Sequence, residues 1–259
     1  MSEPITLTIT DGVAHLRFNR PERMNVLNIE MAEAFGAAIG NLLDQDAARV
    51  LVMSGAGRNF MAGGDLTGFR DTLDKPAFVQ ATIDPLHGAL KALADSDVIS
   101  IVAGHGRIGG AGVSLVAQAD LALVAEGTSF TFAYTRIAGV PDCAGSWAVP
   151  RAVGLKAAME MVLLNEAMPA ERALQLGLIN RIVPEAALEA EAMALAARIA
   201  AGPRVSQAHA KRLMRQSFAT GFDDQLDAEK AAFMDCAAQP DFAEGVLAFL
   251  ERRAPRFQP

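Results

Sequence analysis

Two glycine-rich stretches of the chain could place backbone N–H groups around an anion, or around an oxygen that becomes one. The first, at 62–65, reads Ala-Gly-Gly-Asp, and the second, at 106–112, reads Gly-Arg-Ile-Gly-Gly-Ala-Gly. Glycine adopts backbone conformations closed to other residues and lets a ligand approach bare N–H groups. A short helix expected at about 112–118 would direct its free N–H groups and its dipole at the second stretch. The second stretch therefore predicts a site for an anion, or for an oxygen that becomes one.

The second stretch is open to two other interpretations. Residues 104–109 fit the dinucleotide fingerprint G-x-G-x-x-G after a strand, with Glu126 near the place of a ribose-binding acid. The expected helix is too short for a normal crossover, and the stretch lies in mid-chain. An ordinary tight turn without a ligand is the second alternative, because glycine clusters are common in loops. The sequence favours an enolate oxygen because of the residues that follow.

A carboxylate stands in a loop that is expected to run into a helix. This is Asp142, in Val-Pro-Asp-Cys-Ala-Gly at 140–145. A carboxylate beside an enolate can transfer protons, whereas an aspartate just before a helix commonly caps it. Apolar and aromatic residues could line a pocket near it or belong to the core: Phe60, Met61, Phe130, Phe132, Tyr134, Ile137 and Trp147.

The elements that must position these loops follow from the spacing of apolar residues. A hairpin is expected over 5–18 around Asp11-Gly12, and Asn28 is expected to cap a helix over 29–43. Further strands are predicted at 49–54, 98–103, 128–133 and 178–183, and the end of the apolar run 113–124 should form another strand after the short helix. Helices are expected at 77–94, 157–164 and 169–176. The stretch 67–76 looks mobile. From 185 to 251 the chain should be nearly all helix, so the fold class is α/β with a helical tail.

Composition bounds the class of protein. Half of the 259 residues are hydrophobic, and the net charge of −7 argues against a general nucleic-acid binder. The two cysteines and four histidines show no disulfide or metal-ligand spacing, so no metal is expected. The N-terminus does not resemble a signal peptide, and no apolar stretch is long enough to span a bilayer. We therefore expect a soluble, cytoplasmic protein without a membrane partner.

Four stretches together resemble the crotonase superfamily, the enoyl-CoA hydratase/isomerase family. They lie at 19–28, 59–66, 106–115 and 139–151, and the segment 173–184 is also similar. The resemblance implies a crotonase-like spiral of β-β-α repeats over 1–195 and a C-terminal α-helical trimerisation region over 196–259. It also implies an acyl-CoA thioester as substrate and a homotrimer or dimer of trimers. Coenzyme A would enter as part of the substrate, with no separate cofactor.

The resemblance assigns roles to individual residues. Gly64 and Ala111 would donate their backbone N–H groups to a thioester enolate. The family often has glycine at the position of Ala111, and alanine can still present its N–H there provided that its φ is not positive. Four residues would lie along coenzyme A: Arg23 near the phosphates, and Ala62, Asp65 and Leu66 near the adenine and pantetheine.

The reaction depends on the acid and base groups. A hydratase of this family uses two glutamates, but Ser114 and Tyr134 stand at those positions. The remaining carboxylate, Asp142, suits an isomerase that moves one proton, and the chain looks most like the ring 1,2-epoxyphenylacetyl-CoA isomerase branch. Tyr134, His87 and Trp147 would line the substrate pocket.

Three alternatives to the isomerase stay open. The first is a simple hydratase. The second is a dehalogenase-like hydrolase in which Asp142 is the nucleophile, His87 matches that branch's histidine and Tyr134 replaces its tryptophan. The third is a non-catalytic coenzyme A-binding member, which would tolerate loss of both glutamates. His87 could equally be an ordinary helix histidine.

Overall fold

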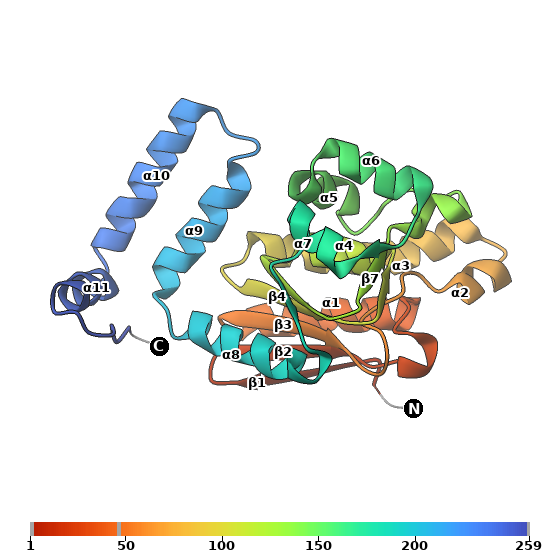
Figure 1. The fold of residues 1–259 in the computed structure, drawn as a ribbon, viewed down its shortest axis with the longest axis horizontal. Coiled ribbons are helices and arrows are strands. Elements are labelled where there is room, and N and C mark those ends of the chain that lie inside the picture. The colour runs from red at the N-terminus through yellow and green to blue at the C-terminus, as the bar shows by residue number, and fades with distance from the viewer. Residues whose placement is uncertain (1–2, 46–47, 258–259) are drawn as a thin grey trace.

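A six-stranded sheet forms the centre of the protein (Figure 1). The computed structural model describes residues 3–45 and 48–257. The first two strands form an antiparallel hairpin, and each later strand of this sheet joins it in parallel. In spatial order the strands are β1 (Ile5–Thr10), β2 (Val13–Phe18), β3 (Val50–Gly55), β4 (Ile99–Gly104), β6 (Leu121–Ala125) and β9 (Arg181–Val183).

A smaller, three-stranded sheet contains strands that follow strands of the large sheet along the chain. It consists of β5 (Arg107–Gly109), β7 (Ser129–Thr131) and β8 (Met168–Pro169). Strand β4 is followed by β5 and helix α4 (Ala111–Gln118), and β6 is followed by β7 and, after a loop, α5 (Gly145–Val153). These are the expected β-β-α repeats. Strand β5 inside the second glycine-rich stretch was not predicted, because three residues are too few to show a period of two.

Strand β3 of the large sheet is buried on both faces. Leu51 and Met53 point into the main core, beneath α1 (Ile29–Asp44) and α3 (Lys75–Asp95). Val50 and Val52 point the other way, into a second core closed by α8 (Leu188–Ala200). Side chains alternate along a strand, so burial on both faces requires a continuous apolar run. The run at 49–54 has this composition, which explains why it was recognised as a buried strand.

Local signals determine the first two turns of the chain. Asp11 and Gly12 have φ values of 50° and 74°, as a two-residue hairpin turn requires. The side chain of Asn28 accepts a hydrogen bond of 3.0 Å from the N–H of Met31 and so caps α1. Both predictions are confirmed.

The stretch expected to be mobile contains a helix that was not predicted, and its mobility stays a prediction. Helix α2 (Leu66–Asp71) is capped by Asp65, whose carboxylate accepts from the N–H groups of Thr67 at 3.0 Å and Gly68 at 3.3 Å. A helix of six residues is too short to show an amphipathic period. The capping aspartate was the available signal.

The C-terminal helices extend from the body as an arm (Figure 1). The arm comprises α9 (Arg204–Gln216), α10 (Phe222–Ala237) and α11 (Pro240–Leu250). Buried Lys211 anchors it, because its Nζ donates to the carbonyls of Val98 at 2.6 Å and Leu93 at 3.1 Å. The boundary expected between the regions 1–195 and 196–259 falls inside α8 and stays a prediction. Residues 1–2 and 258–259, at the outer ends of these two regions, lie outside the described residues.

The remaining elements connect these parts. Helices α6 (Leu155–Leu164) and α7 (Ala170–Leu176) follow α5, and short 3-10 helices lie at Pro21–Arg23, Ala133–Ile137 and Glu185–Ala187. Within residues 3–45 and 48–257, no helix is long and apolar enough to cross a membrane.

Candidate active site

The two glycine-rich stretches pack directly against each other. The N–H of Gly109 donates to the carbonyl of Met61 at 2.9 Å. A Cβ on Gly109 would lie 2.8 Å from the carbonyl oxygen of Ala62, and one on Gly63 would lie 3.4 Å from the carbonyl oxygen of Gly109. A side chain at Gly109 would therefore force the loops apart. The glycines are needed for this close approach.

The residue before each expected oxyanion donor has a positive φ. Gly63, before Gly64, has φ 105°, and Gly110, before Ala111, has φ 48°. These values suit glycine and turn the following peptide groups in directions that ordinary residues disfavour. Ala111 begins α4 and is not among the positive-φ residues, so its side chain causes no strain.

Both expected donors keep a free N–H group. Leu27 donates to the carbonyl of Gly63 and accepts from the N–H of Asp65, each at 2.8 Å, so the N–H of Gly64 between them points away from Leu27. The N–H of Ala111 lies in the first turn of α4, where N–H groups have no partner within the helix. No hydrogen-bond acceptor for either group is found among the described residues. Two unused donors on touching loops can hold a developing oxyanion.

Asn25 holds the loops around this site and was missed by the sequence analysis. Its side chain is fully buried, and its Nδ2 donates to three carbonyls of the segment that leads into the first glycine-rich stretch, those of Ala56, Asn59 and Phe60. Its Oδ1 accepts from the N–H of Arg20 at 2.8 Å. A buried amide needs such partners. Its place inside the first family-like stretch was the only signal in the sequence.

The structure brings Asp142 together with the two positions where a hydratase glutamate was expected. The hydroxyl of Tyr134 donates to Oδ1 of Asp142, and its oxygen lies 3.2 Å from Oγ of Ser114. Ser114 comes from α4, Tyr134 from the 3-10 helix at Ala133–Ile137, and Asp142 from the loop before α5. One carboxylate and two neutral hydroxyls thus form a row.

Asp142 does not cap the helix that follows it. The N-cap of α5 is Ala144, and no side chain caps this end. Cys143 and Ala144 have φ values of 48° and 60°, which are unfavourable for residues with a Cβ. Such strain is characteristic of functional sites, so this loop conformation supports the catalytic interpretation of Asp142 over the capping one.

The groups beside Asp142 are held neutral. Burial, and then the charge of Asp142, raise the pKa of the Tyr134 hydroxyl far above its usual range. The same two causes raise the pKa of the buried Cys143 thiol. Desolvation and a nearby negative charge both disfavour a second anion. Neither Tyr134 nor Cys143 can therefore serve as a base at neutral pH.

The residues expected along coenzyme A lie around the first glycine-rich loop. Arg23 is exposed at the end of the 3-10 helix Pro21–Arg23, and Ala62 touches the second loop at Gly109. Asp65 uses its carboxylate to cap α2, and Leu66 is 56% exposed. Their contact with coenzyme A stays a prediction.

His87 and Trp147 are not linked to Asp142 by any hydrogen bond or ring contact among the described residues. His87 lies on α3, and its Nε2 is buried without a hydrogen-bond partner in the described part of the chain. The Trp147 ring is stacked by Arg151, whose guanidinium carbon lies 4.1 Å from the ring centre. Their place in the substrate pocket stays a prediction.

Some of the apolar residues expected to line a pocket belong to the core, and one of them packs against the site. Phe60, Met61 and Phe130 are fully buried in the main core, so they do not line an open pocket. Phe132 packs edge-on against Tyr134, with ring centres 5.2 Å apart. This contact fixes the tyrosine ring that reaches Asp142.

The dinucleotide fingerprint does not form its usual geometry. Strand β5 occupies Arg107–Gly109, inside the fingerprint, and α4 starts only at Ala111. The fingerprint requires a turn that leads directly from strand to helix. The turn therefore fits one oxyanion donor, the N–H of Ala111 at the start of α4, better than it fits a pyrophosphate.

Comparison with known proteins shows the family. A sequence model described as enoyl-CoA hydratase/isomerase matches residues 8–259. The chain belongs to the enoyl-CoA hydratase/isomerase family. Its expected α/β crotonase-like fold is thereby confirmed, and so is its character as an enzyme of a family that acts on acyl-CoA thioesters.

Some relatives of the chain are named hydratases and others are named isomerases. A probable enoyl-CoA hydratase of Rhodobacter capsulatus is 35% identical over 254 residues, covering 98% of this chain and 97% of the relative. The 1,2-epoxyphenylacetyl-CoA isomerase of Escherichia coli is 32% identical over 262 residues, covering 99% of each chain. The crystal structure of an enoyl-CoA hydratase of Mycobacterium smegmatis superposes with a TM-score of 0.91 at 30% identity, covering 99% of each chain. The choice between hydratase and isomerase therefore depends on the site.

Proposed function

We propose that the protein is an acyl-CoA isomerase with Asp142 as its single acid and base. The observation that carries the proposal is the row Ser114–Tyr134–Asp142, which contains one carboxylate where a hydratase of this family uses two. A reaction that removes a proton and returns it needs only one such group.

The free N–H groups of Gly64 and Ala111 would hold the thioester carbonyl oxygen. Asp142 takes a proton from the acyl chain, and the electron pair left on carbon moves into the carbonyl to form an enolate. The two N–H groups stabilise the negative oxygen. Asp142 then returns the proton to a different carbon. The double bond has moved, and no atom has been gained or lost.

Water addition is disfavoured by the same row. A hydratase must activate a water molecule and protonate the α-carbon, two tasks commonly shared by two carboxylates. The hydroxyl of Ser114 is a weak acid, and the raised pKa of Tyr134 keeps its hydroxyl from acting as a base. The proposal covers migration of an enoyl double bond and, from the similarity to the 1,2-epoxyphenylacetyl-CoA isomerase, isomerisation of an epoxide-bearing aromatic acyl group.

Coenzyme A would run along the first glycine-rich loop. Arg23 is exposed and positively charged, which suits the phosphates. Asp65 already uses its carboxylate as a helix cap, so it would contact the substrate through its backbone. Ala62 and Leu66 flank the expected donor Gly64 and would touch the adenine and pantetheine.

The deciding experiment gives purified protein a 3-enoyl-CoA and, separately, a 2-enoyl-CoA. Absorbance reports the conjugated double bond, and mass reports the addition of water. We expect bond migration without an increase in mass. Hydration as the main reaction would reject the isomerase. Bound acyl-CoA with no reaction would favour the nucleophilic or non-catalytic alternatives.

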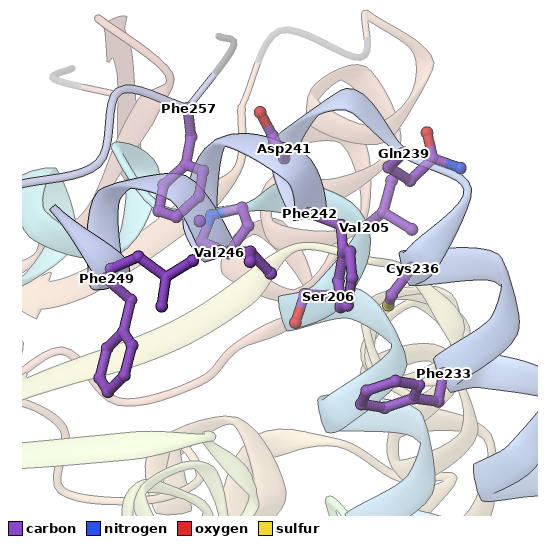
Figure 2. A pocket seen from close by; sticks show the side chains of 13 residues that line it. Val205, Ser206, Phe233, Cys236, Gln239, Asp241, Phe242, Val246, Phe249 and Phe257 are labelled. Atoms are coloured by element: carbon purple, nitrogen blue, oxygen red, sulfur yellow. The ribbon is translucent and has the colours of Figure 1, made fainter.

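The arm of helices α9–α11 would join copies of the chain into a cytoplasmic homotrimer or a dimer of trimers. An apolar groove of about 420 Å³ lies between these helices, and Figure 2 shows Phe233, Phe242, Val246 and Phe249 around it. Phe233 and Phe249 are 66% and 84% exposed in the isolated chain. Apolar surface of this kind is typical of interfaces.

Sedimentation or light scattering measures the assembly directly. We expect a mass of three or six times 27.3 kDa, and a shift toward the monomer in Phe249→Asp. A wild-type monomer at micromolar concentration would contradict the proposed assembly.

A further inference from the structure

One hydroxyl group connects the proposed base to the helix that carries an oxyanion donor. Tyr134 donates to Oδ1 of Asp142, and its oxygen lies 3.2 Å from the Oγ of Ser114. Ser114 is fully buried in α4, the helix that begins at Ala111. The hydroxyls of Tyr134 and Ser114 thereby link the carboxylate of Asp142 to α4, the helix whose first residue is the expected oxyanion donor.

The tyrosine ring has little freedom to move. Phe132 meets it edge-on, and a Cβ on Gly110 would lie 4.0 Å from its Cζ. The backbone around Tyr134 is closed by hydrogen bonds of 2.7 Å from its N–H to the carbonyl of Phe132 and of 3.0 Å to its carbonyl from the N–H of Gly139. The hydroxyl therefore has a defined place relative to the carboxylate.

A carboxylate on a loop can present either oxygen to a substrate unless a hydrogen bond distinguishes them. Proton transfer needs the reacting atoms in a narrow range of geometry. We infer that Tyr134 is a positioning residue: its hydroxyl, oriented by Ser114, holds Oδ1 of Asp142 and leaves Oδ2 to exchange the proton with the bound acyl chain. This inference rests on the proposed isomerase function.

The electrostatics of the cluster support this role. Burial and the charge of Asp142 raise the pKa of Tyr134, so its hydroxyl keeps its proton and acts as a donor. The neighbouring Cys143 thiol also stays protonated, because burial and the same charge raise its pKa. Both groups beside Asp142 therefore stay neutral, and the Tyr134 hydroxyl can donate a hydrogen bond to the charged carboxylate.

The chain contains one tyrosine, so a spectroscopic test can observe Tyr134 alone. Full-length protein labelled with ¹³C at tyrosine Cζ should give one NMR signal at neutral pH. We expect this signal to move in Asp142→Asn and, by less, in Ser114→Ala. Thr135→Val is the matched control, because the Thr135 hydroxyl lies in the same 3-10 helix and donates to the carbonyl of Val162 at 2.6 Å. A signal unchanged by Asp142→Asn would overturn the inference.

Kinetics test whether this hydrogen bond serves the reaction. Tyr134→Phe keeps the ring and removes the hydroxyl, so kcat should fall at least about tenfold while KM stays within about twofold. Adding Asp142→Asn should cause no loss beyond that of Asp142→Asn alone, because the two residues act as a unit. Thr135→Val should keep the wild-type kcat.

Two kinetic results would overturn the inference: a wild-type kcat in Tyr134→Phe, or an equal fall in Thr135→Val. Failure of the proposed function is a different result, in which the wild-type protein moves no double bond at all. The NMR comparison does not depend on turnover, so it would still decide whether Asp142 holds the hydroxyl of Tyr134.

Discussion

Replacing Asp142 with asparagine should lower kcat for double-bond migration about 10³- to 10⁴-fold and leave acyl-CoA affinity within about twofold. The amide is nearly isosteric and still offers an oxygen to the hydroxyl of Tyr134, so the loop should keep its conformation. It cannot accept the substrate proton. Single-turnover absorbance measures the rate, and calorimetry measures binding.

Asp95→Asn is the matched control, because Asp95 is exposed at the end of α3. We expect it to keep wild-type rates, as surface substitutions away from special features usually do. A rate within about tenfold of wild type in Asp142→Asn would contradict the role of Asp142 as the sole base, since acid–base groups contribute at least about 10²-fold. Loss of acyl-CoA binding in Asp142→Asn would indicate a structural role instead.

Removing one oxyanion donor should have the second large effect. Ala111 is the first residue of α4, a position where proline is well tolerated because its N–H has no helical partner. Ala111→Pro deletes this N–H from the site and should lower kcat about 10²- to 10³-fold. The melting temperature should change little, because no internal hydrogen bond of the described residues is lost.

Leu155→Pro provides the control for the proline itself. Leu155 is the first residue of α6, follows a glycine as Ala111 does, and is 66% exposed. It should show a similar small change in melting temperature with no change in kcat. If Ala111→Pro is stable, binds acyl-CoA and reacts at the wild-type rate, the N–H of Ala111 does not hold the enolate.

The sequence alone was sufficient for the parts of the fold that depend on neighbouring residues. The hairpin around Asp11-Gly12, the cap at Asn28 and the C-terminal helices rest on turn chemistry and on periods of two or 3.6 residues. These signals act within a few residues and leave a pattern that can be read directly. The three-residue strand β5 and the six-residue helix α2 were not predicted, because neither lies in a longer run of apolar residues with the period of its type.

The resemblance to the family also indicated Gly64 and Ala111 as candidate donors and Asp142 as the candidate acid and base, and these roles stay predictions. It could not show what these residues touch. Only the tertiary structure showed that Tyr134 donates to Asp142 and that buried Asn25 donates to three carbonyls. It also showed that Asp142 does not cap α5. Those contacts join segments from different helices, strands and loops, and their geometry depends on how the whole core packs, which no local pattern of residues records.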